Sequence, residues 1–481
     1  MRPAAAILLG IAPLIIACGD SRPAADPVKL PAGRAPASPA APIPAASGRE
    51  LVAQLGCAGC HPGVGAANEA RERAPSLAGI GARRSRGYMF AYLADPSRVR
   101  SGNARARMPD FHLDESERLA LTLYLGTLRD DAAPNERLAG GALSEDQSRA
   151  LEAAFARARE SHPEATPAAG ERIFASLDCA ACHALPGVTR WLAGPELAAE
   201  GSRVKVEWLR GFLTRPSAIR PFGAYVGSGS RMPDFHLSED EVDSLVAYLG
   251  AMRTKLAPTD SLPALSVFRE HEVESLLRDR LPCLGCHRLG DDGGRIGPDL
   301  TNVGARLQPG YIRAIVEDPQ HVVPGSIMPR VPIPPRTVTR IVAYLASRGS
   351  SRARSSDSVR AGYVSLVEHT SFLPSAGDDA ASLYGRICSN CHGRSGDGDG
   401  WNAEYLPVRP TIHSDAKYIS TRSDQTLYDG IAAGGYVLDR SNRMPPFGET
   451  LSDAQIDALV VYIRGLCDCE GPAWSRDGAS R

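Results

Sequence analysis

The sequence predicts a helical protein made of four repeats of one domain-sized unit. First, the pentapeptide Cys-x-x-Cys-His occurs four times, and its first cysteine recurs at steps of 122, 104 and 105 residues. Second, each copy is followed by a Met-Pro pair and then by a segment with the apolar period of an amphipathic helix. A repeat of this length is a domain rather than a unit of a solenoid.

The helix that closes each unit carries the clearest signals. In the second unit, Ser238 and Glu241 form a predicted capping box. Apolar residues then follow at the spacing of one buried helical stripe: Val242, Leu245, Val246 and Leu249. The fourth unit repeats this pattern with Ser452, Gln455 and the stripe Ile456, Leu459, Val460 and Ile463. A tyrosine recurs in all four closing helices, and we expect it to pack against the first helix of the unit: Tyr124, Tyr248, Tyr344 and Tyr462.

The earlier part of each unit is also repetitive. Gly48-x3-Val52 and Gly170-x3-Phe174 precede their motifs in the same register, and Leu383-Tyr384 takes a similar place in the fourth unit. The third unit lacks this pattern and has many charges between 269 and 280. A proline lies in the middle of every unit: Pro75, Pro195, Pro298 and Pro410. The heptapeptide Arg-Met-Pro-Asp-Phe-His-Leu occurs identically at 107–113 and 231–237, which indicates tandem duplication.

The pentapeptide is the attachment signature of c-type haem, in which two thiols form thioethers and the adjacent histidine ligates the iron. The predicted attachment residues are Cys57, Cys60, Cys179, Cys182, Cys283, Cys286, Cys388 and Cys391. The predicted proximal ligands are His61, His183, His287 and His392. A zinc site is the alternative, but zinc sites bring two such pairs close in sequence, whereas these lie about a hundred residues apart. The sequence therefore predicts four covalently attached haem c groups.

Each unit resembles a class I c-type cytochrome domain, an all-α fold in which the first and last helices cross and haem fills the core. The resemblance implies methionine as the second iron ligand, at Met108, Met232, Met328 and Met444. It also implies that the carbonyl of the mid-unit proline accepts the ring N–H of the histidine, which would orient the ligand. Histidine is the competing second ligand, with these candidates: His112, His236, His321 and His413.

Histidine and methionine together would close the coordination of each iron, and methionine raises the reduction potential. A filled sixth position argues against peroxidase, oxygenase or nitrite chemistry. The sequence therefore predicts an electron carrier with no catalytic residues, relaying electrons between redox proteins of a respiratory chain. One alternative is a cytochrome subunit of a larger dehydrogenase, quinol-oxidising or terminal oxidase complex. Another is a haem enzyme in its own right. The net charge of −1 gives no general attraction to nucleic acid.

The N-terminus predicts secretion and a lipid anchor. Arg2 precedes an apolar run from Ala4 to Ala17 that is too short to span a bilayer, and no other segment is long enough. The run ends in Ile-Ile-Ala-Cys18, which resembles the lipobox of bacterial lipoproteins. The resemblance implies cleavage before Cys18 and acylation of its thiol, which would hold the protein on the periplasmic side of a bacterial membrane. An ordinary signal peptide is the alternative.

These features predict the following organisation. The chain begins with a signal peptide at 1–17 and a disordered Pro/Ala linker at 18–47. Four cytochrome domains follow, at 48–130, 167–256, 262–349 and 377–469. A helical linker at 131–166 separates the first two, a Ser/Arg-rich linker at 350–376 precedes the fourth, and a disordered tail at 470–481 ends the chain. Within 131–166, we expect one helix from Leu143 to Arg159 with Ser144 as its N-cap. Cys467 and Cys469 form a local disulfide, an intermolecular bridge or two free thiols.

Charge differs between the units. Residues 48–130 hold 12 basic and 9 acidic side chains, whereas 376–470 hold 8 basic and 14 acidic ones. We hypothesise that the acidic fourth unit docks a basic redox partner, and the alternative is an ordinary solvated surface.

Overall fold

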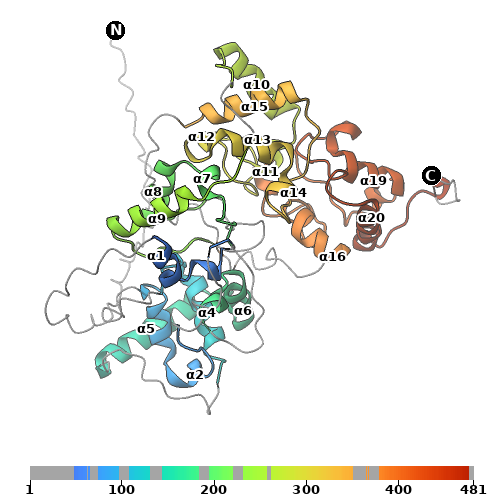
Figure 1. Cartoon of the computed structure of the whole chain (residues 1–481). Helices are drawn as coiled ribbons and strands as arrows, with labels where there is room; N and C mark the ends of the chain where they lie inside the picture. Colours follow the sequence, from blue (N-terminus) through green and yellow to red (C-terminus); the bar gives the residue numbers. More distant parts are fainter. Residues whose placement is uncertain are drawn as a thin grey trace, which may run out of the picture.

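The computed structural model describes residues 48–61, 63–64, 74–96, 108–129, 144–183, 194–219, 231–256, 262–349, 365, 367 and 379–475. Throughout these residues the secondary structure is helical, with isolated two-residue bridges and no strand. The helices form four groups, which we call bodies A to D (Figure 1). The predicted signal peptide, Cys18 and the first linker lie outside the described residues, as does most of the linker at 350–376.

Body A contains most of the first unit and the beginning of the second. Its helices are α2 (Ile80–Arg83), α3 (Arg86–Tyr92), α4 (Glu115–Leu125), α5 (Glu145–Ser161), α6 (Pro167–Ser176) and the 3-10 helix η3 (Cys179–Ala181). The predicted linker helix is α5, which begins after a capping box of Ser144 and Gln147. It packs against α3 and α4 through Leu151, Phe155 and Ala158, so it belongs to the core of this body.

Body B contains the beginning of the first unit and the rest of the second. Its helices are α1 (Gly48–Leu55), the 3-10 helix η1 (Cys57–Gly59), α7 (Glu200–Arg203), α8 (Val206–Thr214) and α9 (Glu239–Ala251). The capping box of Ser238 and Glu241 begins α9, and the predicted stripe of Val242, Leu245, Val246 and Leu249 is buried. In Figure 1, α1 lies beside α9.

The first helices of units one and two are therefore exchanged. Helix α1 packs on α9 of the second unit, while α6 packs on α4 of the first unit. The approach is close in both places, because a Cβ on Gly48 would overlap the Ser244 carbonyl and one on Gly170 would overlap the Ala120 carbonyl. The chain passes from body B to body A after Val64 and returns after His183. The structure thus divides these residues differently from the predicted domains 48–130 and 167–256.

The third and fourth units form bodies C and D without exchange. Body C holds α10 (Val267–Asp279), α11 (Cys283–Cys286), α12 (Val303–Arg306), α13 (Pro309–Glu317), α14 (Pro319–Val322) and α15 (Pro335–Ser347). Despite its charges, α10 packs on α15 through Val273 and Leu277. Body D holds α16 (Ala380–Leu383), the π-helix η6 (Tyr384–Cys388), α17 (Ser389–His392), η7 (Ala403–Tyr405), α18 (Ala416–Ile419), α19 (Asp424–Ala433), η8 (Gly435–Leu438), α20 (Asp453–Cys467) and η9 (Ala473–Ser475). The last of these lies within the predicted tail.

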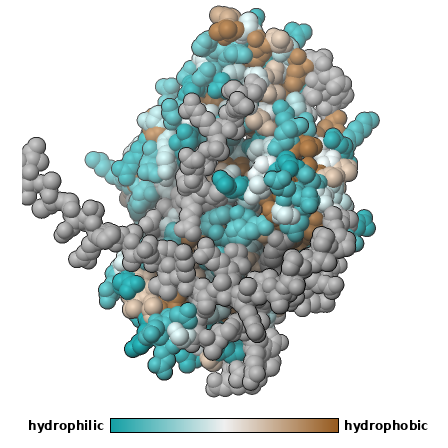
Figure 2. Space-filling model, turned by 90° about the vertical axis from the view of Figure 1, so that its left-hand side faces the viewer, coloured by the Kyte–Doolittle hydropathy of each residue, from teal (hydrophilic) through white to brown (hydrophobic). Residues whose placement is uncertain are grey.

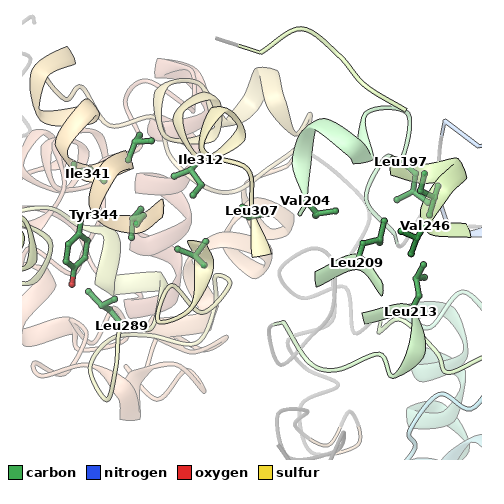
Figure 3. Close-up of a cluster of buried hydrophobic side chains, with 14 of the residues drawn as sticks. Leu197, Val204, Leu209, Leu213, Val246, Leu289, Leu307, Ile312, Ile341 and Tyr344 are labelled. Atoms are coloured by element: carbon green, nitrogen blue, oxygen red, sulfur yellow. The ribbon is translucent and has the colours of Figure 1, made fainter. Parts of the chain in front are cut away.

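Bodies B and C share one buried apolar cluster. It runs from Leu209, Leu213 and Val246 in body B to Ile312, Ile341 and Tyr344 in body C (Figure 3). Between them, Val204 and Leu307 pair across an antiparallel bridge. Lys205 N–H donates to the Arg306 carbonyl and Gln308 N–H donates to the Arg203 carbonyl. Bodies A and B are joined by a second bridge, between Asp110 and Asp234 of the duplicated heptapeptide.

No helix within the described ranges is long and apolar enough to cross a membrane. On the face drawn in Figure 2, the described residues are mostly hydrophilic, with apolar side chains in small patches.

Candidate haem sites

The third motif shows how one site is built within a single unit. His287 Nδ1 lies 2.7 Å from the Pro298 carbonyl oxygen, and Gly297 N–H donates to the Cys286 carbonyl at 2.7 Å. A carbonyl can only accept, so Nδ1 carries the proton, and in a neutral imidazole the lone pair is then on Nε2. Gly297 lies so close that a Cβ there would meet the His287 ring at 2.5 Å. The backbone thus fixes the orientation of the imidazole, and the predicted bond to the mid-unit proline carbonyl is present.

The first motif has the same contacts, but they come from the second unit. His61 Nδ1 lies 2.9 Å from the Pro195 carbonyl oxygen, and Gly194 N–H donates to the Cys60 carbonyl at 2.9 Å. A Cβ on Gly194 would overlap the His61 ring, as on Gly297 in the third site. Conversely, His183 Nδ1 lies 3.0 Å from the Pro75 carbonyl oxygen. The expectation that each proline serves the histidine of its own unit is therefore corrected for these two sites.

The fourth site differs in its acceptor. His392 Nδ1 lies 2.9 Å from the carbonyl oxygen of Thr411, one residue after the predicted Pro410. The intervening glycine-rich loop accounts for the shift, since Gly398 packs under the Pro410 carbonyl and His413 N–H donates to the Gly396 carbonyl. The orienting bond to a backbone carbonyl is nevertheless kept.

A cavity of about 1450 Å³ is lined mainly by residues of bodies B and C, with further residues from bodies A and D. His61, His287, Met232 and Met328 are all among its lining residues. Single ligand pockets span roughly 300–1,000 Å³. The cavity is therefore larger than one small-molecule pocket, and two of the predicted histidine ligands and two of the predicted methionine ligands line it. This donor set and the space fit haem groups.

Two of the four motif histidines have a lowered pKa. Burial lowers the pKa of His61 to about 4, against the opposing effect of its bond to Pro195. Burial also lowers the pKa of His392. Burial raises the pKa of the Cys57 and Cys179 thiols to about 12 and that of Cys283 to about 11. Neutral imidazoles in a dry pocket suit iron ligation.

Two arginines that line the cavity belong to a repeated sequence pattern that the haem motifs alone do not reveal. Arg203 and Arg306 line the cavity, and burial lowers the pKa of Arg306 to about 10, with the charge of Arg203 adding to the effect. Haem carries two carboxylates, so these partly buried guanidinium groups would complement it, although Arg203 also pairs with Glu200 in the same cavity. The sequence holds the signal as Gly-x-Arg, eight residues after the proline: Arg83, Arg203 and Arg306. The glycine of each packs on the end of a closing helix, at Gly126, Gly250 and Ala346.

The motifs lie side by side in pairs. A Cβ on Gly59 would lie 3.2 Å from the Ala181 Cβ, which brings the first and second motifs into contact. Asn402 Nδ2 donates to the Gly285 carbonyl at 3.0 Å and to Cys391 Sγ at 3.3 Å, which joins the third and fourth. Nevertheless, no cluster of three or more His, Cys, Asp or Glu residues suited to a metal ion occurs in the part of the chain that the structure describes.

The competing histidines lie elsewhere. His236 has 47% of its side chain exposed, and His321 is exposed at the end of α14. His112 is buried beside Asp110, with Nδ1 3.6 Å from the carboxylate. His413 stacks on the proximal His392 at 4.1 Å between ring centroids, and its Nδ1 lies 3.0 Å from the Tyr384 hydroxyl. A ring stacked flat on the proximal imidazole does not face that imidazole across an iron.

For the two cysteines near the C-terminus, three alternatives were open: a local disulfide, an intermolecular bridge or two free thiols. The structure has the local disulfide. Cys467 and Cys469 form a disulfide at the end of α20.

Comparison with known proteins agrees with the motifs. The cytochrome c family matches residues 45–129, and the family cytochrome c oxidase, cbb3-type, subunit III matches residues 165–249 and 375–463. The chain therefore contains c-type cytochrome domains, which bind haem c covalently and carry electrons. An exchange between homologous units leaves such linear matches intact, because each body receives an equivalent first helix.

Two relatives extend the comparison. The chain is 30% identical over 133 residues to cytochrome c oxidase subunit 2 of Alkalihalophilus pseudofirmus, a match that spans 25% of this chain and 36% of that protein. The second relative is a chain of the reducing HAO-like protein complex of Kuenenia stuttgartiensis. The match covers 44% of this chain and 99% of that one, at 16% identity and a TM-score of 0.16. That score is too low to define a shared fold.

Proposed function

We propose that this chain is a tetrahaem c-type cytochrome that relays electrons between redox proteins on the periplasmic side of a bacterial membrane, to which acylated Cys18 tethers it. The four repeated motifs support the count of four. One observation carries the proposal: the proximal histidine of every motif has its Nδ1 on a backbone carbonyl. In a neutral imidazole this tautomer places the lone pair on Nε2, the nitrogen that would ligate iron.

The residues of the chain would divide the work as follows. Eight cysteines hold the groups covalently, and His61, His183, His287 and His392 supply the proximal nitrogen. Met108, Met232, Met328 and Met444 supply the thioether that closes each site and raises the potential. Buried apolar side chains exclude water, and Arg203 and Arg306 balance the carboxylates of the group. Bound haem supplies reversible one-electron chemistry.

A spectroelectrochemical titration of the purified chain, combined with its intact mass, tests this function. We expect a mass increase of four haems, low-spin spectra and the near-infrared methionine–iron band for all of them. Fewer haems would contradict the count of four. A fraction that is high-spin and binds carbon monoxide would contradict a pure carrier and favour a haem enzyme.

The tether has its own test. Cells that express the chain with Cys18 or with Cys18→Ser are labelled with a radioactive fatty acid. The proposal expects label and membrane association only with Cys18. Equal membrane association of the variant without label would refute the lipid anchor.

A second candidate is a cytochrome subunit of a larger respiratory complex. The names of two relatives, a cbb3-type oxidase subunit III and a cytochrome c oxidase subunit 2, favour it. Gentle solubilisation of native membranes followed by mass spectrometry separates the candidates. A stoichiometric partner that stays bound favours the subunit, whereas a chain that runs alone favours the relay.

The acidic fourth unit supports a basic redox partner. Steering between opposite charges weakens as salt screens them. We expect the rate of electron exchange with a basic cytochrome to fall as ionic strength rises. A rate independent of salt would remove this docking hypothesis.

A further inference from the structure

The exchange of first helices reaches the iron ligands. At the third site, which is built within one unit, Gly297 and Pro298 contact His287, and Arg306 and Met328 line the same cavity. At the first site, Gly194 and Pro195 make the corresponding contacts with His61, and Arg203 and Met232 line the cavity. All four come from the second unit, although the motif comes from the first.

The two methionines are separated by their surroundings. Met232 lines the same cavity as His61, and it packs in the same apolar cluster as Cys57. Met108 does not line that cavity, and it packs in the other cluster, with Cys179. Each methionine therefore shares its surroundings with the motif of the opposite unit.

Buried polar contacts hold the two methionine segments in this arrangement. Asp110 and Asp234 exchange backbone hydrogen bonds of 2.9 and 2.8 Å, two residues after each methionine. Arg231, next to Met232, donates to the His112 carbonyl at 2.9 Å and to Glu117 at 2.6 Å, and both side chains of this ion pair are almost fully buried. These bonds join the two methionine segments, while Met108 packs against the cluster of body A and Met232 against that of body B.

We infer that the axial pairs of the first two sites are crossed: Met232 completes the site of His61, and Met108 completes the site of His183. This rests on the proposed function, which supplies haem and methionine ligation. Each of these two haem sites then needs residues from both of the first two units. The third and fourth sites pair their ligands within one unit.

The test removes one haem attachment site and then determines which methionine no longer contributes to the methionine–iron band. In the full chain, Cys57→Ser with Cys60→Ser eliminates attachment at the first site and leaves three haems, as checked by intact mass. In this background, we expect Met108→Ala to remove about one third of the methionine–iron band and to create one high-spin haem. Met232→Ala should leave the spectrum unchanged. The background Cys179→Ser with Cys182→Ser should give the mirror result.

The opposite pattern would overturn crossing while leaving the proposed function intact. If neither methionine affected any spectrum in either background, both the crossing and methionine ligation at these sites would fail. Met108→His and Met232→His serve as variants that keep the sixth position filled and so protect folding. They should remove the same share of the band and lower the reduction potential of one haem, in the same backgrounds as the alanine variants.

Discussion

At the scale of the residue, the buried ion pair of Arg231 and Glu117 is the most consequential polar contact between the first two units. Arg231 Nη2 lies 2.6 Å from Glu117 Oε1, and the side chains are 2% and 0% exposed. Burying two charges costs free energy, so the pair adds little net stability by itself. It favours a particular arrangement because the loss of one partner leaves the other charge buried and uncompensated.

We expect Arg231→Met to lower the free energy of unfolding by about 3–5 kcal/mol, because Glu117 would be left buried and uncompensated. The double variant with Glu117→Leu should recover much of this loss. Denaturant titration of the chain measures both. Arg149→Met is the control, since the Arg149–Asp146 pair is 75% and 86% exposed and should contribute little. Equal losses in the single and double variants would contradict the explanation.

Asp292 is a second residue with effects beyond its own unit. Its carboxylate accepts from Arg278 of body C at 2.8 Å and from Arg443 of body D at 3.0 Å. Burial alone would raise the pKa of Asp292, but the hydrogen bonds and charges of Arg443 and Arg278 outweigh it and hold the pKa below its usual value. A lowered pKa gives stability that is present above the unfolded value of about 3.9 and is lost as pH falls below it.

We therefore expect the contact between bodies C and D to loosen as pH falls below about 4. Hydrogen exchange of the Asn442 and Arg443 backbone would report this. Asp292→Asn should bring the same loosening at neutral pH and remove its acid dependence. Asp291→Asn is the matched control, because the side chain of Asp291, next to Asp292 in the sequence, is fully exposed. A protection pattern that was identical in both variants would refute the role of Asp292.

At the scale of the element, glycine sets how closely the exchanged helices approach. Gly170 on α6 lies against the Ala120 carbonyl and the Tyr124 Cβ on α4, and Gly48 on α1 lies against Ser244 and Tyr248 on α9. The predicted packing of the recurring tyrosine on a first helix is thus observed, with the partners crossed. The Tyr124 and Phe174 rings lie 5.6 Å apart.

We expect Gly170→Ala to destabilise body A by about 1–3 kcal/mol, because the methyl group overpacks the contact of α6 with α4. Gly211→Ala on α8 is the matched control: nothing lies within 4 Å of its Cβ position, so alanine should stabilise that helix by about 0.5–1 kcal/mol. Thermal unfolding compares the two. Stabilisation by both substitutions would show that α6 does not approach α4 this closely.

At the scale of the whole molecule, the exchange ties the first two units into one object. Body A needs α6 from beyond α5, and body B needs α1 from the start of the described chain. Two units connected only by a linker would separate when the linker is cut. Two units that each hold a helix of the other would not.

A protease site inserted between 131 and 143 tests this connectivity. After cleavage, we expect the fragments to migrate together in size-exclusion chromatography at nanomolar concentration and to separate only in denaturant. The matched control is a cleavage site between 351 and 364, after which no exchanged helix in the described part of the chain holds body D. Separation of the first cut in plain buffer would contradict the exchange.

Much of this architecture could be predicted from local patterns. The capping boxes at Ser144, Ser238 and Ser452 begin helices as expected, because a cap is decided by residues three positions apart. In the third unit, the charges between 269 and 280 mask the two apolar contacts of α10, so the local pattern does not predict this helix. The Gly-x-Arg repeat was present in the sequence but carries meaning only once its glycine is seen against a closing helix.

The sequence by itself determined the cofactor class, the motif positions and the order of elements within a unit, because spacing and periodicity are properties of short segments. Only the tertiary structure decided which first helix serves which site. The two units present the same signals at that contact, a glycine on one helix, a tyrosine on the other and an identical heptapeptide, so either pairing satisfies the local pattern. The choice depends on contacts between distant residues, such as Arg231 with Glu117 and His61 with Pro195.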